Sequence, residues 1–449
     1  MAPATTTLQL VSPGAEATFF QGVGEGSQSF FQSRAVSRKH TPFAIEPIVH
    51  FARQSVAPEG GQVLNFVLSN AGDMLGACYL ALKVTKHANS YPGTVKGAWY
   101  AAESCVREVA LRIGSVTVDR QPNTWFRFYD TFHRAQDQQE PYRRMTNFDA
   151  YTLLQPVEAQ ETLYLPLLFT CCRHASAALP LCALMQTEVR IDVALATAEE
   201  AGVQSFDGVE LITDMVYLGE EERSFFTRQP HDLLVEQVQT NLFDLPAGMP
   251  SESNQTTFNA RLGLFRPLKA LYWALQDTSQ SNTFTNHCRW VGGDNPQIFS
   301  DNAAAPSGLA PVQVVSEKLA PVASASLLLN GVPRFSALPG EWWNSVAGYS
   351  QARSCAQAGA YIMPFALRPE ALQVSGTLCA SIIDQIDLAL TLKQSVSNDF
   401  TETAAWSGEA ASRCAYKITG LTRLVVHAWS LNVLRVEGQR AQLLFGEIL

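Results

Sequence analysis

The segment Leu163–Leu195 most constrains the fold, because two of its stretches alternate apolar and polar side chains. A period of two turns one face of a β-strand toward a core and leaves the polar positions, such as Arg190 and Asp192, facing outward. A Leu-Pro-Leu step separates the two stretches, and no catalytic motif interrupts them. The segment therefore predicts sheet-building material. The alternating apolar positions are Leu163, Leu165, Leu167 and Phe169, then Val189, Ile191, Val193 and Leu195.

Composition independently favours an all-β protein. The chain has 449 residues, of which 47% are hydrophobic, so it can bury the cores of two to three domains. Its 23 prolines and 28 glycines punctuate many short apolar runs, as in sandwiches with long loops. The net charge of −9 argues against direct genome binding, which needs a basic surface.

The cysteines and the N-terminal residues indicate a protein made in a reducing compartment. The nine cysteines show no CxxC spacing, and Cys78, Cys182 and Cys379 lie in apolar strand-like runs, where a free cysteine acts as a small hydrophobe. The first residues lack the basic and apolar regions of a secretory signal. No apolar run approaches the roughly 18 residues that span a bilayer. We expect a soluble chain made in the cytosol.

The search for chemistry yields no assigned catalytic, cofactor-binding or metal-binding residue. Cys171, Cys172 and His174 suggest a soft metal site, but adjacent cysteines cannot easily point to one ion, so buried or turn cysteines are the preferred interpretation. Paired acids at Glu199-Glu200 and at 220–222 leave a β-sandwich carbohydrate enzyme open as an alternative. His427, alone on a late strand, is interpreted as a hydrogen-bonded barrel residue.

Several segments resemble the major capsid protein of nucleocytoplasmic large DNA viruses, the double jelly-roll family. Each segment is short, but they occur in the family's order along nearly the whole chain. Gly114-Ser115 and His174-Ala175-Ser176 depart from the family's turn residues, which affects local turn geometry and leaves the alternating core positions intact. The similar segments are 8–51, VREVALRIGSVTVDR (106–120) with Trp125, 163–195, 214–239, RPLKALYWALQD (266–277), LLLNGVPRF (327–335) and 368–390.

This resemblance implies two tandem eight-stranded antiparallel jelly-roll barrels with short capping helices and long loops. The expected parts are an N-terminal arm at 1–40, a first barrel at 41–213, a connection at 214–232 and a second barrel at 233–449. Two pairs of segments are similar to each other without forming a detectable repeat. These are VREVALRIG (106–114) with RPLKALYWAL (266–275), and TEVRIDVALA (187–196) with IDQIDLALTL (383–392).

Apolar patterning places the expected strands and helices. A helix is expected within 122–135, with Asn123 as its N-cap, and another after the acidic start at 220–222. Long loops are expected near 240–257 and 278–323. The expected strands are 63–68, 76–85, 105–119, 162–169 and 183–196, then 233–240, 257–265, 268–276, 324–329, 359–367, 384–392 and 424–436.

The resemblance implies a structural protein of the virion shell and no enzyme or cofactor. Three copies would close into a homotrimer with a pseudo-hexagonal outline that tiles an icosahedral capsid. Minor capsid and penton proteins are the expected partners, with the internal viral membrane beneath the N-terminal arm, and assembly is expected in the host cytoplasm. A scaffolding protein of membrane assembly and the carbohydrate-active protein remain the alternatives.

Interface candidates come from charge and aromatic content. Arg34, Arg38 and Lys39 form a basic cluster in the arm, where subunit salt bridges or a solvated linker are preferred over lipid contact. Trp342, Trp343 and Tyr349 lie in an expected loop at 336–358 and either anchor an interface or pack on their own barrel. Asn254 begins a glycosylation sequon, but a cytosolic chain does not meet the glycosylation machinery, so we expect no modification.

Overall fold

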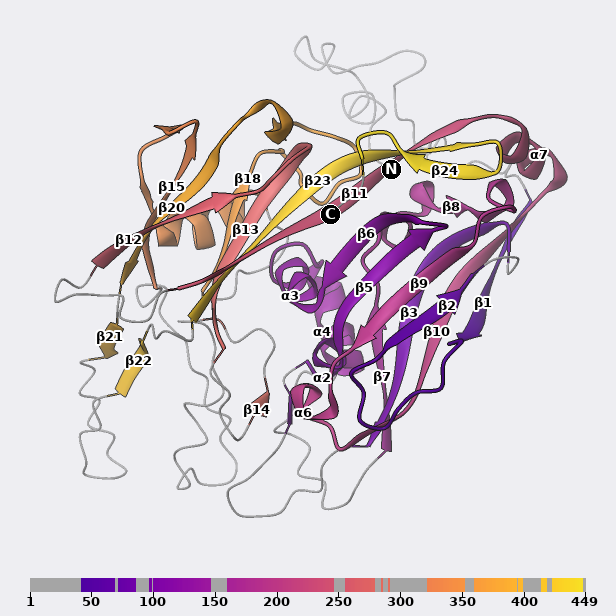
Figure 1. Ribbon diagram of the computed structural model, residues 1–449, viewed down its shortest axis with the longest axis horizontal. Coiled ribbons are helices and arrows are strands. Elements are labelled where there is room, and N and C mark those ends of the chain that lie inside the picture. The colour runs from indigo at the N-terminus through magenta and orange to yellow at the C-terminus, as the bar shows by residue number, and fades with distance from the viewer. Residues whose placement is uncertain are drawn as a thin grey trace, which may run out of the picture. The chain divides into compact units, whose positions relative to one another are not determined.

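A computed structural model describes most of the chain, and residues 44–449 form one compact unit. Strands dominate this unit and form two groups, one drawn from indigo to magenta and the other from rose through orange to yellow (Figure 1). The described residues are 42–68, 72–85, 97–98, 100–146, 160–245, 255–278, 284–285, 290, 321–351, 359–393, 395–398, 413–417 and 422–446.

The first group contains two facing antiparallel sheets that enclose one part of the core. Leu80, Leu82 and Leu211 lie on the inner side of one sheet, and Ile191 and Val193 on the inner side of the other, all fully buried. One sheet has the order β1 (Phe43–Phe51), β10 (Ser205–Leu218), β3 (Met74–Thr85) and β7 (Gln160–Pro166), with β8 (Leu179–Pro180) also on β3. The other has the order β2 (Val63–Val67), β9 (Val189–Leu195), β5 (Val106–Ile113) and β6 (Val116–Pro122).

The second group repeats this plan later in the chain. Its inner positions include Trp273, Leu388 and Leu390, which are again buried. One sheet has the order β11 (His231–Asp244), β23 (Thr422–Glu437), β13 (Pro267–Asp277) and β18 (Ala360–Pro364), with β19 (Leu378–Cys379) also on β13. The other has the order β12 (Gln255–Leu262), β20 (Ile386–Lys393), β15 (Val322–Leu329) and β16 (Val332–Pro333), with β17 (Leu338–Pro339) also on β15.

The two barrels match in the order of the four main strands of each sheet, while β17 and β24 (Arg440–Leu443) of the second barrel have no counterpart in the first. In each barrel the first and last of these main strands pair at one side of a sheet, and a two-residue strand joins the third member of that sheet. The similar segments 187–196 and 383–392 contain β9 and β20, which occupy equivalent positions. The segments 106–114 and 266–275 contain β5 and β13, which do not. The chain is therefore a structural duplication, recorded only weakly in its sequence.

Helices cap the barrels, and the sequence predicted two of them. Helix α3 (Asn123–Phe132) and helix α7 (Glu220–Arg228) lie where helices were expected, but Pro122 occupies the N-cap position of α3 and Asn123 is already helical. The expected strand at 105–119 is a hairpin of β5 and β6, since Gly114 has a φ of +60° between them. The segment expected as a loop at 336–358 contains a π-helix, η5 (Trp342–Val346), followed by α9 (Ala347–Gln351).

The alternating pattern of the segment 163–195 is confirmed, with one correction. The apolar positions of β7 and β9 are buried as expected. Asp192 points away from the core, yet only 9% of it is exposed. Two arginines cover its carboxylate, with Arg112 Nε 3.0 Å from Oδ2 and Arg190 Nε 3.2 Å from Oδ1.

The remaining elements are short connections and edge pairs. The short helices are α2 (Ala101–Ser104), α5 (Thr170–Arg173), α6 (Ala198–Ala201), η2 (Ala175–Ala177), η3 (Leu181–Ala183) and η6 (Ala380–Ile382). Helix α4 (Gln136–Thr146) is longer. The remaining strands are β4 (Gly97–Ala98), β14 (Phe284–Thr285), β21 (Ser395–Asn398), β22 (Arg413–Lys417) and β24 (Arg440–Leu443).

Gly60 offers a sharp test of the first barrel's packing. Its φ is +69°, and a Cβ there would lie 2.3 Å from the carbonyl oxygen of Ala196. We expect Gly60→Ala to lower the free energy of unfolding by about 1–2 kcal/mol for the left-handed backbone, plus about 1–3 kcal/mol for the clash. Gly331→Ala is the matched control, because its φ is +78° but its Cβ would meet nothing within 4 Å. Equal losses in chemical denaturation would contradict the close approach.

Candidate assembly surfaces

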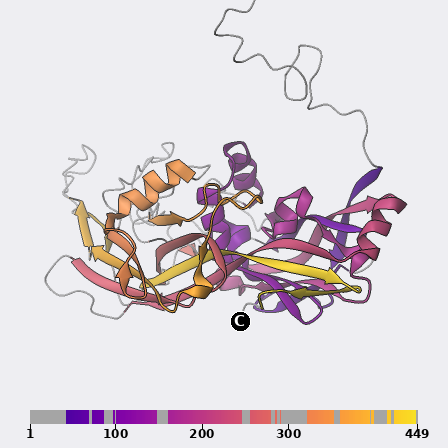
Figure 2. The same ribbon diagram turned by 90° about the horizontal axis from the view of Figure 1, so that it is seen from above.

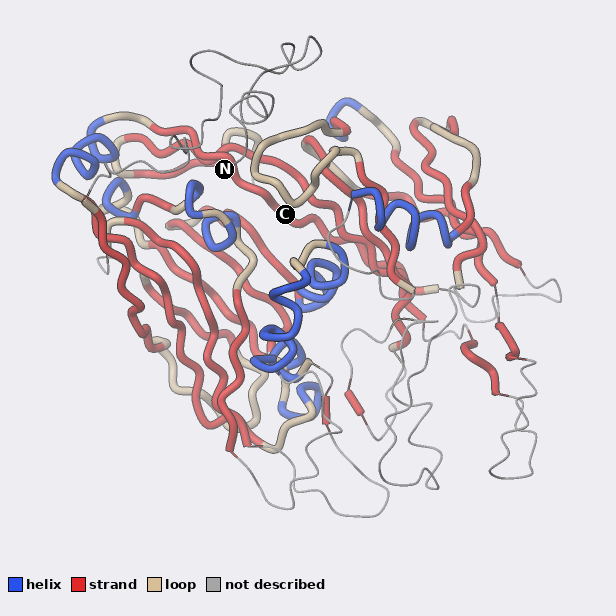
Figure 3. The backbone as a smooth tube through the Cα atoms, turned by 180° about the vertical axis from the view of Figure 1, so that it is seen from behind, coloured by secondary structure: helices blue, strands red, loops and turns tan. Residues whose placement is uncertain are grey.

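Helix α3 of the first barrel packs on the outer face of the β11–β23–β13 sheet, and we call this contact the inter-barrel seam. Trp125 meets Tyr272 and Trp429 edge-on, with ring centroids 5.3 and 5.4 Å apart. Phe128 lies 5.3 Å from the His427 ring. Figure 3 shows the helices of this region in blue between the two groups of strands. Such aromatic contacts add to the stabilisation from apolar burial, so the seam joins the barrels firmly.

His427 sits in the middle of the seam as a neutral, fully hydrogen-bonded side chain. Its Nε2 lies 2.8 Å from the Thr124 hydroxyl, and its Nδ1 lies 3.0 Å from the Thr240 hydroxyl. Burial lowers the pKa of His427 from 6.5 to about 3. Because a neutral imidazole has one donor and one acceptor, two hydroxyls satisfy it. The interpretation of His427 as a hydrogen-bonded barrel residue is confirmed.

The lowered pKa of His427 predicts a pH-dependent stability. The unfolded chain binds a proton at this residue below about pH 6.5, whereas the folded chain resists protonation down to about pH 3. The contribution of His427 to the free energy of unfolding is therefore fully present above pH 6.5. It is lost as the pH falls toward 3, by about 1.4 kcal/mol per pH unit. We expect the difference in free energy of unfolding between wild type and His427→Gln to shrink at that rate. A constant difference between pH 6.5 and about 4.5 would contradict a buried neutral histidine.

A cluster of charges lies beside the aromatic part of the seam. Glu236 of β11 pairs with Lys269 of β13 and with Arg173 of α5, and the three side chains are 1%, 0% and 7% exposed. Lys269 Nζ also donates to the carbonyl oxygen of Ala371 at 2.8 Å. Thr170 contributes a hydroxyl that accepts the Glu236 N–H at 2.8 Å. One carboxylate thus bridges a basic side chain from each barrel.

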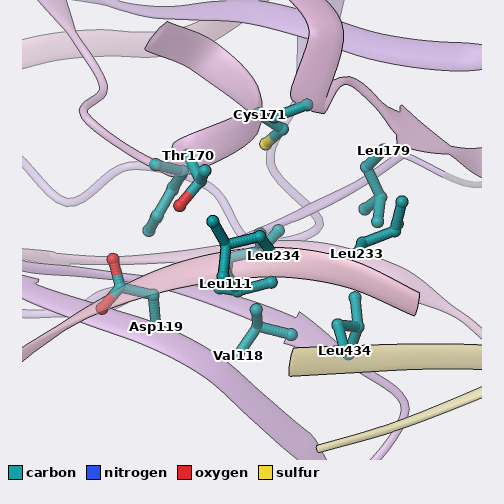
Figure 4. Close-up of a pocket in the computed structure, with 12 residues that line it drawn as sticks. Leu111, Val118, Asp119, Thr170, Cys171, Leu179, Leu233, Leu234 and Leu434 are labelled. Carbon is teal, nitrogen blue, oxygen red and sulfur yellow. The ribbon is translucent and has the colours of Figure 1, made fainter. Parts of the chain in front are cut away.

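A small pocket at the seam is a packing space with a single carboxylate at its edge. Apolar side chains line most of it, including Leu111 of the first barrel and Leu233, Leu234 and Leu434 of the second (Figure 4). Burial raises the pKa of Asp119 to about 6. Its oxygens already accept hydrogen bonds from Val238 N at 3.0 Å and from Gln121 Nε2 at 2.7 Å. The hydrogen bond between Asp119 and Val238 therefore joins β6 of the first barrel to β11 of the second.

The structure separates the three aromatic interface candidates. Trp343 is 6% exposed and packs on its own barrel, with its ring 6.1 Å from Trp273 and 5.3 Å from Phe335. Trp342 and Tyr349 are 43% and 92% exposed and point away from that core. The other candidates, Arg34, Arg38, Lys39 and Asn254, lie outside the described residues.

The residues considered above as catalytic or metal-binding candidates take part in helix capping, ion pairing or packing. Glu200 completes a capping box with Thr197 at the start of α6 and pairs with Arg107 at 2.7 Å. Cys171 and Cys172 are free thiols with sulfurs 3.9 Å apart. Within the described residues no group of three His, Cys, Asp or Glu side chains could hold a metal ion. In that same part of the chain, no helix has the length and apolarity to cross a membrane.

Comparisons with known proteins agree with this geometry. The family model "Major capsid protein N-terminus" matches residues 29–218, and the model "Large eukaryotic DNA virus major capsid protein" matches residues 222–441. The major capsid protein of Paramecium bursaria Chlorella virus 1 is 32% identical over 437 residues, covering 95% of this chain and 96% of that protein. The major capsid protein of Phaeocystis pouchetii virus is 27% identical and covers 86% of this chain and 92% of its own length.

Solved structures extend the match to three dimensions. The PBCV-1 virus capsid aligns with a TM-score of 0.77 at 31% identity, over 93% of this chain and 100% of that one. The Faustovirus major capsid protein aligns with a TM-score of 0.63 at 10% identity, over 95% of both chains, which shows a shared fold.

Two tandem barrels, packed through a helix-on-sheet seam, define a double jelly-roll structural protein. The chain belongs to the major capsid proteins of large eukaryotic DNA viruses. It is a structural component of the virion capsid, as its relatives are, and not an enzyme.

Proposed function

We propose that this chain forms homotrimers in which six barrels give a pseudo-hexagonal capsomer, and that these capsomers tile an icosahedral shell. The duplication of one strand order within the chain supports this proposal most strongly. Three copies supply six similar barrels, and head-to-tail contacts close into a ring when the rotation between successive units completes a circle. The sequence suggested 1–40 as arm, 41–213 and 233–449 as barrels, and 214–232 as connection, but β10 ends at Leu218 and β11 begins at His231, so the connection we propose is 219–230.

Other partners follow from the arm and its basic cluster. We place residues 1–40 beneath the shell, where the arm would meet minor capsid proteins and an internal membrane, while Arg34, Arg38 and Lys39 would form subunit salt bridges or stay solvated. Penton proteins are the other proposed partners. Assembly would take place in the host cytoplasm.

The native mass of the purified chain tests the trimer. One chain has a mass of 49.1 kDa, so we expect a species of 3 × 49.1, or about 147 kDa, in sedimentation at micromolar concentration. A stable 49.1 kDa species would count against the proposal. The chain should also be the most abundant protein of purified particles, whereas a scaffolding protein would be absent from them.

A further inference from the structure

Helix α3 shows how one barrel of this fold contacts the next. Its side chains at 125, 128, 129 and 132 contact aromatic residues of the β11–β23–β13 sheet. Phe126, the neighbour of Trp125, is fully buried. An aromatic doublet at the start of the helix thus has one ring in the seam and one in the interior of the protein.

The second barrel carries a helical segment at the equivalent point, and three of its apolar side chains are exposed. Both helices follow the last strands of equivalent sheets, after β6 in one barrel and after β16 and β17 in the other. Trp342-Trp343 repeats the doublet Trp125-Phe126, because Trp343 is buried and Trp342 points outward. Val346 is 42% exposed, so Trp342, Val346 and Tyr349 form an outward stripe at steps of four and three residues. In Figures 1 and 2 this helical segment is orange and lies apart from the seam.

The first barrel carries the sheet that such a helix needs. The β1–β10–β3–β7 sheet is equivalent to the β11–β23–β13–β18 sheet that receives α3. On β1, Ile48 packs toward the core and His50 bonds to the buried Thr213 at 2.8 Å, so the odd-numbered residues face outward. Of these, Ile45, Val49 and Phe51 are 59%, 45% and 71% exposed.

Neighbouring strands extend this apolar outer face. Ile212 of β10 lies opposite Tyr79 of β3, and Tyr164 of β7 lies opposite Ala81 in the same layer. Asp214 lies on this face near Tyr79, and two further charges, Lys83 and Glu210, pair with each other. An apolar helix docking beside this pair leaves neither of its charges bare.

We propose that the outward stripe of one copy, Trp342, Val346 and Tyr349, docks on the β1–β10–β3–β7 face of a second copy of this chain. This contact repeats between chains the α3 contact that joins the barrels within a chain. It is head-to-tail, so each copy presents one stripe and receives another, and the contact closes into a ring. The inference rests on the proposed trimer and names the surfaces that build it.

Two variants test the pairing of surfaces. The stripe variant carries Trp342→Asp and Tyr349→Asp, and the sheet variant carries Val49→Asp and Phe51→Asp. All four side chains are partly or largely exposed in the single chain, so each variant should keep the wild-type circular dichroism spectrum. Met185→Asp, another exposed apolar position, is the control and should keep the wild-type native mass.

Mixing the variants separates this interface from any other. Each variant alone should sediment at 49.1 kDa, and a mixture should form a 1:1 dimer of 2 × 49.1, or about 98 kDa, because the intact stripe of one fits the intact sheet of the other. A trimer in either variant alone, or a mixture that stays monomeric, would overturn the inference. If the wild type is still a trimer in that case, the proposed function stands. A monomeric wild type would overturn both.

Discussion

Replacing Glu236 with alanine should destabilise the folded chain by about 3–5 kcal/mol. The change removes the one carboxylate that pairs with both Lys269 and Arg173, and all three side chains are almost completely buried. A buried charge left without its partner costs far more than the pair contributes when intact. The loss should appear as a lower midpoint in equilibrium guanidinium unfolding of the purified chain.

The same strand offers a matched control. Asp232 of β11 pairs with Arg435 at 2.8 Å, with the two side chains 49% and 38% exposed. Asp232→Ala should cause a much smaller loss, because water solvates the arginine that remains. If the two substitutions lowered stability equally, the burial of the Glu236 cluster would be wrong.

Trp125→Ala should have a comparable effect for a different reason. It leaves a cavity at the seam and removes the edge-on contacts with Tyr272 and Trp429. Large-to-small changes of a buried tryptophan cost about 3–5 kcal/mol. Loss of this helix contact should also expose the join between the barrels, so limited proteolysis should cut between them faster than in wild type.

Trp125→Phe keeps the measurement interpretable if the alanine variant fails to fold. A phenylalanine retains an edge-on ring and part of the buried area. The free energy of unfolding of this variant should therefore lie between those of the wild type and of the alanine variant. A phenylalanine variant as unstable as the alanine variant would argue against ring packing as the cause.

The sequence predicted those parts of the fold that depend on local pattern. Strand β20 lies where its alternation placed it, whereas β9 fills only the second half of the strand expected at 183–196, because η3 and a turn precede Val189. Strand β10 was not predicted, because register shifts at Phe206/Gly208 and Thr213/Met215 break its period of two. Strand β1 also lacked a clear signal, since Pro47 interrupts it and its exposed apolar residues do not mark a core.

The assembly surfaces depend on contacts that no local pattern records. Thr124 and His427 are 303 residues apart, yet share a hydrogen bond at the centre of the seam. Glu236 and Lys269 occupy strands where a charged residue ordinarily marks the solvent side, but the other barrel covers them. The aromatic pair Trp342-Trp343 marked a segment that either anchors an interface or packs on its own barrel. Only the helix and its burial show which ring faces outward.

A cryo-EM reconstruction of the purified chain tests the account most directly. We predict a threefold particle with six barrels in a ring, in which a helix packs on the outer face of a sheet at every junction, α3 within chains and η5–α9 between them. Barrels that meet between chains through other faces, or particles of a single chain, would contradict it.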